Sequence, residues 1–290
     1  RTSVGLMECK KALVKVDGDI EKAVDLLRVQ GLAMAAKKAG RTANEGAVAA
    51  WVNAKGDAGL VLEVNCETDF VARTDDFRAL VQDLVANFAA SAYLAQSGLY
   101  EDVEALLASP FYRDSSRTIR DIIGDVVGKT GENIQLGRFG VINLSGRNAR
   151  VQLYEHAGGR VTSLVGIEAG KPETLKNEKF LSLAKDLAMQ VAAGMPRVPV
   201  AVKRDEVPED ILEEEKRIYH EQTLAEGKPE NLVDKIVMGR LNKFFKEVVL
   251  LEQPFIKEEK QSVQGIIDGV AKELGEDIAP VMFFRFAIGD

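Results

Sequence analysis

The first 40 residues carry the apolar spacing of amphipathic helices. One face of a first helix is apolar at Cys9, Ala12, Leu13 and Val16, and a second helix repeats the pattern at Ile20, Ala23, Val24 and Leu27. Between the two helices Asp17 and Gly18 favour a turn, and Asp19 can cap the second helix. We expect the second helix to stop at Gly31 and a short third segment to follow it, so residues 1–40 are predicted to form a three-helix module.

After a linker over residues 41–46 the pattern changes to short apolar strands, and an internal repeat begins. A shift of 103 residues superimposes the two copies without a gap. The residues Val48, Ala54, Gly56, Phe77, Leu80, Asp83, Leu84, Ala89 and Ala90 fall on Val151, Ala157, Gly159, Phe180, Leu183, Asp186, Leu187, Ala192 and Ala193. Each copy shows a strand, a turn, a second strand, a connection and an amphipathic helix. We therefore predict an α+β fold with two related subdomains and small antiparallel sheets, over residues 47–145 and over residues 146–204 with 250–290.

Residues 205–249 interrupt the second copy with two helix-length segments. Apolar residues recur at Ile211, Ile218 and Ala225 in the first segment and at Val233, Val237, Leu241, Phe244 and Val248 in the second. This spacing, with the turn sequence "EGKPE" between the segments, predicts an inserted antiparallel coiled-coil hairpin. The hairpin is either an interaction arm or a solvated insertion, and His220 on it is expected to be exposed.

The composition of the chain argues against several classes of function. Its 45 acidic and 38 basic residues give a net charge of −7, which lacks the basic character that binding to a phosphate backbone requires. No apolar run approaches the roughly 20 residues that span a bilayer. Cys9 and Cys66 have no metal-ligand spacing and are expected to be reduced thiols of a cytosolic protein. With only His156 and His220 in the chain, we expect no multi-histidine metal site, no cofactor and no well-supplied catalytic centre.

The stretch "GDVVGKTGEN", residues 124–133, is similar to a phosphate-binding loop but does not fit one. Such a loop needs four residues between its first glycine and the Gly-Lys pair, whereas Gly124 and Gly128 enclose three. The preceding residues have the spacing of a helix, although a phosphate loop follows a strand. We therefore predict the end of a helix and a turn at Gly128 and Gly131, and no nucleotide hydrolysis by this chain.

An aromatic residue stands in a polar connection, "NCETDFVARTDDF", residues 65–77. Phe70 either packs on the core of its own domain, with Asp69 as a helix cap, or contacts a partner protein. The repeat provides a comparison, because the second copy has Glu173 where the first has Phe70. The scaffold therefore forms without an aromatic ring at this position, which favours the partner contact.

Several segments together resemble the bacterial elongation factor Ts family, the guanine-nucleotide exchange factors of elongation factor Tu. These segments are "GLMECKKAL", "GDIEKAVDLLR", "AAKKAGRTANEG", "LEVNCETDFVA", "GENI", "YEHAGG", "EGKPENLVDKIVMGRLNKFFKE" and "QPFI". They follow one another in order along nearly the whole chain, and "TDFV" with "CKKAL" is a highly specific combination. The resemblance implies a UBA-like N-terminal module, two related core subdomains, an inserted coiled-coil hairpin, and a cytoplasmic translation factor without an active site of its own.

The resemblance also implies which residues contact elongation factor Tu. The matching positions are Leu6, Met7, Lys10, Thr68, Asp69, Phe70, Val71, His156 and Ile256. The Phe70 ring is expected to enter an apolar slot near the magnesium and nucleotide site of the partner, and the N-terminal residues to meet its GTPase domain. For the other residues, core packing, a solvated charge or a structural hydrogen bond is the plainer alternative. A homodimer of the heterodimer is left open.

The implied mechanism is linkage between two binding equilibria. A factor that binds the nucleotide-free GTPase more tightly than the GDP-bound form must weaken GDP binding by the same ratio, because the coupling free energy is reciprocal. Two other classes of protein compete with this interpretation. A small NTPase would need a phosphate site, and a structural adaptor would bind its partner without changing nucleotide release.

Overall fold

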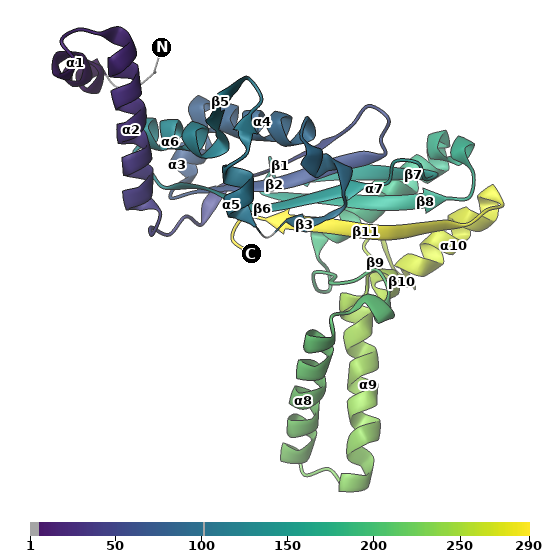
Figure 1. Cartoon of the computed structure of the whole chain (residues 1–290). Helices are drawn as coiled ribbons and strands as arrows, with labels where there is room; N and C mark the ends of the chain where they lie inside the picture. The colour runs from purple at the N-terminus through teal and green to yellow at the C-terminus, as the bar shows by residue number, and fades with distance from the viewer. Residues whose placement is uncertain (1–5, 101) are drawn as a thin grey trace. The chain divides into compact units, whose positions relative to one another are not determined.

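The computed structural model describes residues 6–100 and 102–290. The chain, drawn in Figure 1, divides into two compact units. The first unit contains the residues up to Asn143 together with Glu155–Thr162 and Arg285–Asp290. The second contains Leu144–Tyr154 and Ser163–Phe284. The mixture of helices and small sheets in both units confirms the predicted α+β class.

Two helices form the N-terminal part of the first unit, α1 (Leu6–Lys15) and α2 (Ile20–Lys38). As predicted, Gly18 lies in the turn between them with φ 84°, and the Asp19 side chain caps α2 by accepting a hydrogen bond from the Lys22 amide. The predicted stop at Gly31 is wrong, because α2 continues through this residue, and the described residues of the module form two helices rather than three.

The reason for Gly31 is a close helix crossing. A Cβ atom at Gly31 would lie only 3.0 Å from the carbonyl oxygen of Gly124, which belongs to helix α6 (Ile119–Thr130). Gly128 of α6 lies in the same crossing, because a Cβ atom added to it would be 3.5 Å from the Gly31 Cα. A glycine inside a helix costs about 0.5–1 kcal/mol relative to alanine, and here that cost is offset by the close packing of α2 on α6.

The main sheet of the first unit has the strand order β1-β2-β6-β3. Its strands are β1 (Glu45–Val52), β2 (Ala58–Cys66), β6 (Ile134–Asn143) and the short β3 (Gly98–Tyr100), and all three pairings are antiparallel. The connections hold α3 (Asp69–Ala72), α4 (Asp75–Ala89), the 3-10 turn η1 (Ala92–Ala95), α5 (Val103–Leu107), and the small β4 (Pro110–Phe111) and β5 (Asp114–Thr118) hairpin.

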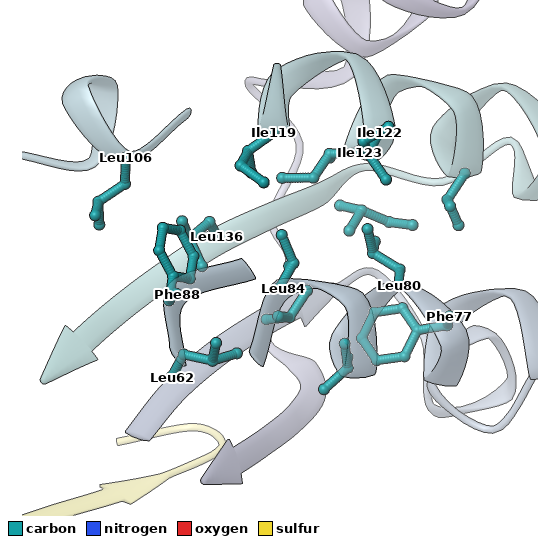
Figure 2. Packing of buried hydrophobic residues seen from close by; sticks show 14 of the residues in the cluster. Leu62, Phe77, Leu80, Leu84, Phe88, Leu106, Ile119, Ile122, Ile123 and Leu136 are labelled. Carbon is teal, nitrogen blue, oxygen red and sulfur yellow. The ribbon is translucent and has the colours of Figure 1, made fainter. Parts of the chain in front are cut away.

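The core of the first unit lies between this sheet and the helices that cover it. Figure 2 shows the side chains that α4, α6 and the sheet contribute to one cluster: Phe77, Leu80, Leu84 and Phe88 from α4, Ile119, Ile122 and Ile123 from α6, and Leu62 and Leu136 from β2 and β6. The apolar spacing of α4 and α6 places these residues on one face of each helix. The predicted helix end and turn are confirmed at Gly131, which ends α6 with φ 72°, and the prediction is wrong at Gly128, which lies inside α6.

The second unit repeats most of these elements, although its described residues contain no counterpart of β3 and α5. Its sheet has the order β11-β8-β7, from β11 (Ile278–Ala287), β8 (Val161–Ala169) and β7 (Ala149–His156). The covering elements are the 3-10 turn η2 (Pro172–Lys176), α7 (Glu178–Ala193), the 3-10 turns η3 (Arg204–Glu206) and η4 (Leu250–Glu252), the β9 (Pro254–Phe255) and β10 (Glu258–Ser262) pair, and α10 (Val263–Leu274).

The element bounds follow the repeat in the sequence and extend it. The bounds of β8 are those of β2 shifted by 103 residues, and η2 begins where the same shift places the start of α3. The bounds of β9, β10, α10 and β11 match those of β4, β5, α6 and β6 at a shift of 144 residues. The larger second shift reflects the insertion of the helices α8 and α9 between α7 and β9.

The insertion consists of α8 (Glu209–Ala225) and α9 (Glu230–Val248), which run side by side in Figure 1. All five apolar positions predicted for the second segment are buried on α9. The prediction for the first segment is only partly correct, because Ile211 and Ile218 are half-buried and Ala225 is exposed. The buried side chain of α8 is Thr223, whose hydroxyl donates to the Tyr219 carbonyl over 2.6 Å.

Candidate functional site

Phe70 projects from a single helical turn, α3, that directly follows strand β2. Its side chain is 79% exposed, so the alternative in which the ring packs on its own core is wrong. The turn begins at Thr68, whose hydroxyl accepts a hydrogen bond from the Val71 amide over 3.4 Å. Thr68 therefore caps this helix, and Asp69 is its first residue rather than its cap.

The residues around Phe70 are fixed to the body of the unit. Val71 is 8% exposed and belongs to the hydrophobic core, and its carbonyl accepts a hydrogen bond from the Thr74 hydroxyl over 2.8 Å. The Thr74 hydroxyl in turn caps α4 by accepting from the Phe77 amide. In the free chain Val71 thus anchors the turn to the hydrophobic core, while the ring of Phe70 points to solvent.

One carboxylate from a distant part of the sequence holds the start of the turn. Glu132 accepts two hydrogen bonds from Thr68, from its amide at 3.0 Å and from its hydroxyl at 2.7 Å. The Thr68 carbonyl accepts a hydrogen bond from the Cys66 thiol over 3.1 Å. Burial, and secondarily the charge of Glu132, raise the pKa of this thiol to about 12. Cys66 is therefore a neutral, structural group that is hydrogen-bonded to the start of the turn.

The charged residues beside the turn are paired on the surface. Asp69 accepts from Arg73 over 2.7 Å, an exposed pair of the kind that contributes little to stability. Glu67 accepts from the Asn133 amide over 2.7 Å and from Arg41 over 3.4 Å. The Asn133 amide bond and, after it, the Arg41 charge lower the pKa of the Glu67 carboxyl, so this group is ionised at neutral pH.

The second copy of the repeat has a different structure at this position. Its η2 turn begins after Lys171, which makes no side-chain capping hydrogen bond, and Glu173 stands at the position of Phe70. Thr174 takes the buried place of Val71. The capped turn with an exposed aromatic ring is therefore a feature of the first copy alone.

The remaining predicted residues lie elsewhere in the chain. Leu6 and Met7 are 85% and 63% exposed at the start of α1, and Lys10 is exposed on the same helix. His156 is exposed at the end of β7. Ile256 is half-buried after β9 in the second unit, and its amide donates to Gln190 over 2.8 Å. The structure thus brings Thr68, Asp69, Phe70 and Val71 together on one turn, and α1 groups the three N-terminal residues.

The described residues offer few features of an enzyme. Residues 124–130 lie inside α6, so most of the stretch that is similar to a phosphate loop is helical. Within residues 6–100 and 102–290, no three His, Cys, Asp or Glu side chains are placed to hold a metal ion together. In the same part of the chain, no helix combines the length and the hydropathy needed to cross a membrane.

Glu132 is a residue of this site that the sequence analysis did not identify. In the sequence it stands in "GENI", which recurs as "GEDI" near the end of the second copy. That recurrence marks the repeat and does not reveal a contact with Thr68, which lies 64 residues earlier in the chain. The contact between Gly31 and Gly124 was not predicted for the same reason, since it joins helices that are far apart in sequence.

Comparison with known proteins identifies one family. The family model described as "Elongation factor TS" matches residues 67–290. An elongation factor Ts of Trichlorobacter lovleyi is 42% identical over 289 residues, covering 100% of this chain and 89% of the relative. The elongation factors Ts of Chlorobaculum parvum and Aquifex aeolicus are 43% and 42% identical over 289 residues, each covering 99% of this chain and 94% of the relative.

These matches define a translation elongation factor of the nucleotide-exchange class, which is not an enzyme in the usual sense. The chain belongs to the elongation factor Ts family.

Proposed function

We propose that this chain binds elongation factor Tu in the cytoplasm and accelerates the release of GDP from it, with the ring of Phe70 entering the partner near its magnesium and nucleotide site. Family membership supports the partner. The observation that carries the role of Phe70 is its 79% exposure on a turn that is anchored on both sides.

The exposure of the ring has an energetic consequence. Full burial of a phenylalanine side chain is worth roughly 1.5–3 kcal/mol, and in the free chain most of this free energy is not realised. A partner with an apolar slot would recover it on binding. Because Glu132 and Val71 already hold the turn, binding needs little further ordering of the backbone, and less of the interaction free energy is lost to entropy.

Other exposed residues extend the proposed contact. Leu6 and Met7 present apolar side chains at the start of α1, and Lys10 adds a positive charge on the same helix. In our proposal these three residues meet the GTPase domain and contribute affinity. His156 and Ile256 are proposed to contact other parts of the partner.

The proposed mechanism follows from reciprocal coupling. If this chain binds nucleotide-free elongation factor Tu more tightly than the GDP-bound form, it lowers the affinity for GDP by the same factor. A ring inserted beside the magnesium site displaces the elements that hold the ion and the phosphates. The contacts made elsewhere supply the binding free energy that sustains this displaced state. No bond of the nucleotide is broken.

The test is stopped-flow release of a fluorescent GDP analogue from elongation factor Tu, with and without this chain. We expect release to accelerate with factor concentration, and no GTP hydrolysis by the chain alone. Unchanged release rates at micromolar factor would contradict the proposal. If the complex forms while release stays unchanged, the chain is a structural adaptor, and if the isolated chain binds labelled GDP, it is a nucleotide-binding protein itself.

A further inference from the structure

We propose that Glu132 is a positioning residue for Phe70, because its carboxylate fixes the capped turn that presents the ring, and that the segment Gly131–Asn133 connects this turn to helix α2. The inference rests on the proposed function of Phe70.

The two oxygens of Glu132 have separate tasks. Oε2 accepts from the Thr68 amide at 3.0 Å, which fixes the backbone where β2 ends and α3 begins. Oε1 accepts from the Thr68 hydroxyl at 2.7 Å, which fixes the rotamer of that side chain. The same hydroxyl caps α3 by accepting from the Val71 amide. A chain of hydrogen bonds therefore runs from the carboxylate through Thr68 to the residue after Phe70, and bonds to an ionised acceptor are the stronger kind.

The residues on either side of Glu132 bind the end of α2 and the linker after it. The Gly131 carbonyl accepts from the Lys38 ammonium group. The Asn133 side-chain amide donates to the Arg41 carbonyl over 2.8 Å, and its backbone amide donates to Glu67. Asn133 itself is 2% exposed. Three consecutive residues thus hold the end of the N-terminal helices and the Phe70 turn at the same time.

The second copy of the repeat shows which role of the carboxylate belongs to the fold and which belongs to the positioning of Phe70. Glu276 stands 144 residues after Glu132 and also binds a threonine hydroxyl, that of Thr174. Thr174 occupies the buried place of Val71, however, and the cap residue Lys171 makes no side-chain capping bond. A carboxylate at this position therefore supports the fold in both copies. Only in the first copy is it coupled to the cap of a turn that carries an exposed ring.

The experiment compares Glu132→Ala and Glu132→Gln with the matched control Glu276→Ala in the full chain. The first measurement does not depend on the partner: hydrogen exchange of the Thr68 and Val71 amides in the isolated protein. We expect Glu132→Ala to lose protection at these two amides while α4 and β2 keep theirs. Unchanged protection of both amides would overturn the proposal.

The second measurement is GDP release from elongation factor Tu, corrected for the folded fraction. Loss of a hydrogen-bonded charge costs on the order of a tenfold change in an equilibrium, so we expect stimulated release to fall by about tenfold in Glu132→Ala. Glu132→Gln should lose less, since its amide oxygen still accepts from Thr68. Glu276→Ala should lower the melting temperature and leave release per folded molecule unchanged. An equal loss of release in Glu276→Ala would assign both carboxylates a purely structural role and overturn the inference.

A double variant distinguishes this inference from the proposed function. If Glu132 acts through the ring, Glu132→Ala should reduce release no further in a Phe70→Ala background, because residues that act as a unit are not additive. Fully additive losses would mean that Glu132 does not act through Phe70. Failure of the proposed function of Phe70 would show separately, because the Phe70→Ala variant would then stimulate GDP release from elongation factor Tu at the wild-type rate.

Discussion

Gly31 of α2 lies against Gly124 of α6, so close that a Cβ atom at Gly31 would be 3.0 Å from the Gly124 carbonyl oxygen. A Cβ at Gly124 would in turn lie 3.0 Å from a methyl carbon of Leu32. The N-terminal helices are therefore held to the rest of the first unit by a packed helix crossing and not by a linker alone. Arg28 adds an ion pair of 2.9 Å to Asp121, which lies in the first turn of α6 and forms a capping box with the N-cap residue Thr118.

A large side chain at Gly31 should separate these helices. We expect Gly31→Leu to lower the free energy of unfolding of the first unit by about 1–3 kcal/mol, the usual cost of overpacking. Hydrogen exchange along α2 should accelerate, and denaturant unfolding gives the magnitude. The control is Gly239→Leu on α9, where a Cβ meets nothing within 4 Å. This variant should be neutral or more stable, by up to about 1 kcal/mol from helix propensity. Equal destabilisation of both variants would contradict the crossing.

Gln190 offers a test of the second unit. Its side chain is fully buried on α7, where Oε1 accepts from the Ile256 amide and Nε2 donates to Gln253 over 3.1 Å. Gln190→Met keeps the volume of the side chain but leaves the Ile256 amide and the Gln253 side-chain oxygen without this partner. The loss should cost about 1–3 kcal/mol for each buried group. Thermal and denaturant unfolding measure the loss. The exposed Gln222→Met on α8 should change stability by no more than about 0.5 kcal/mol, and a similarly small change for Gln190→Met would contradict a stabilising role of these hydrogen bonds.

Local patterns were sufficient to predict most of the fold. The apolar spacing of α4 and the turn chemistry at Asp17, Gly18 and Gly131 depend on residues that are neighbours in sequence, and the structure confirms them. The α+β class followed from the repeat, whose two copies share two strands, a short turn and a helix at their start and two short strands, a helix and a strand at their end. Phe70 was also predicted to be functional from a comparison internal to the sequence.

The incorrect predictions concern contacts between distant parts of the chain. A glycine that ends a helix and one that permits a close crossing look the same locally, so Gly31 was interpreted as a stop. Thr68 caps α3 in place of Asp69 because a carboxylate 64 residues away fixes its hydroxyl. Ala225 follows the seven-residue spacing of α8 but is the last residue of this helix and is exposed.

Cys66 makes stability depend on pH in the alkaline range. Burial raises the pKa of its thiol from an ordinary value of 9.0 to about 12. Between these values the unfolded chain loses the thiol proton while the folded chain keeps it, so the unfolded state binds fewer protons and the free energy of unfolding falls as pH rises. Wild type should therefore lose stability more steeply than Cys66→Ala above about pH 9, measured by urea unfolding from pH 7 to 10.5.

The other groups that titrate in this range, such as Tyr100 and Tyr219 with their raised pKa values, are the same in both proteins and cancel in the comparison. The difference between wild type and Cys66→Ala should be constant below pH 8. A parallel decline of the two curves up to pH 10.5 would show that the thiol ionises in the folded state as easily as in the unfolded chain.

Phe70→Ala is the variant for which a stabilising role and a binding role of the ring predict opposite results. Because the ring is 79% exposed, its removal leaves no cavity, and the variant should melt near the wild-type temperature. If the ring is an anchor for elongation factor Tu, its loss should cost about 2 kcal/mol or more, which is over tenfold in complex affinity or in stimulated GDP release. Differential scanning calorimetry and stopped-flow release measure the two effects on the same samples.

Three further variants complete this comparison. Phe88→Ala removes a fully buried ring of α4 and should lower the free energy of unfolding by about 3–5 kcal/mol. Glu173→Ala, at the equivalent position in the second copy, should leave GDP release unchanged. Asp69→Ala should cause a smaller loss than Phe70→Ala, because its carboxylate forms an exposed ion pair with Arg73 and acts on the turn rather than on the partner's apolar slot. A Phe70→Ala variant that melts far below wild type, and whose folded molecules stimulate release at the full rate, would assign the ring to the stability of its own unit.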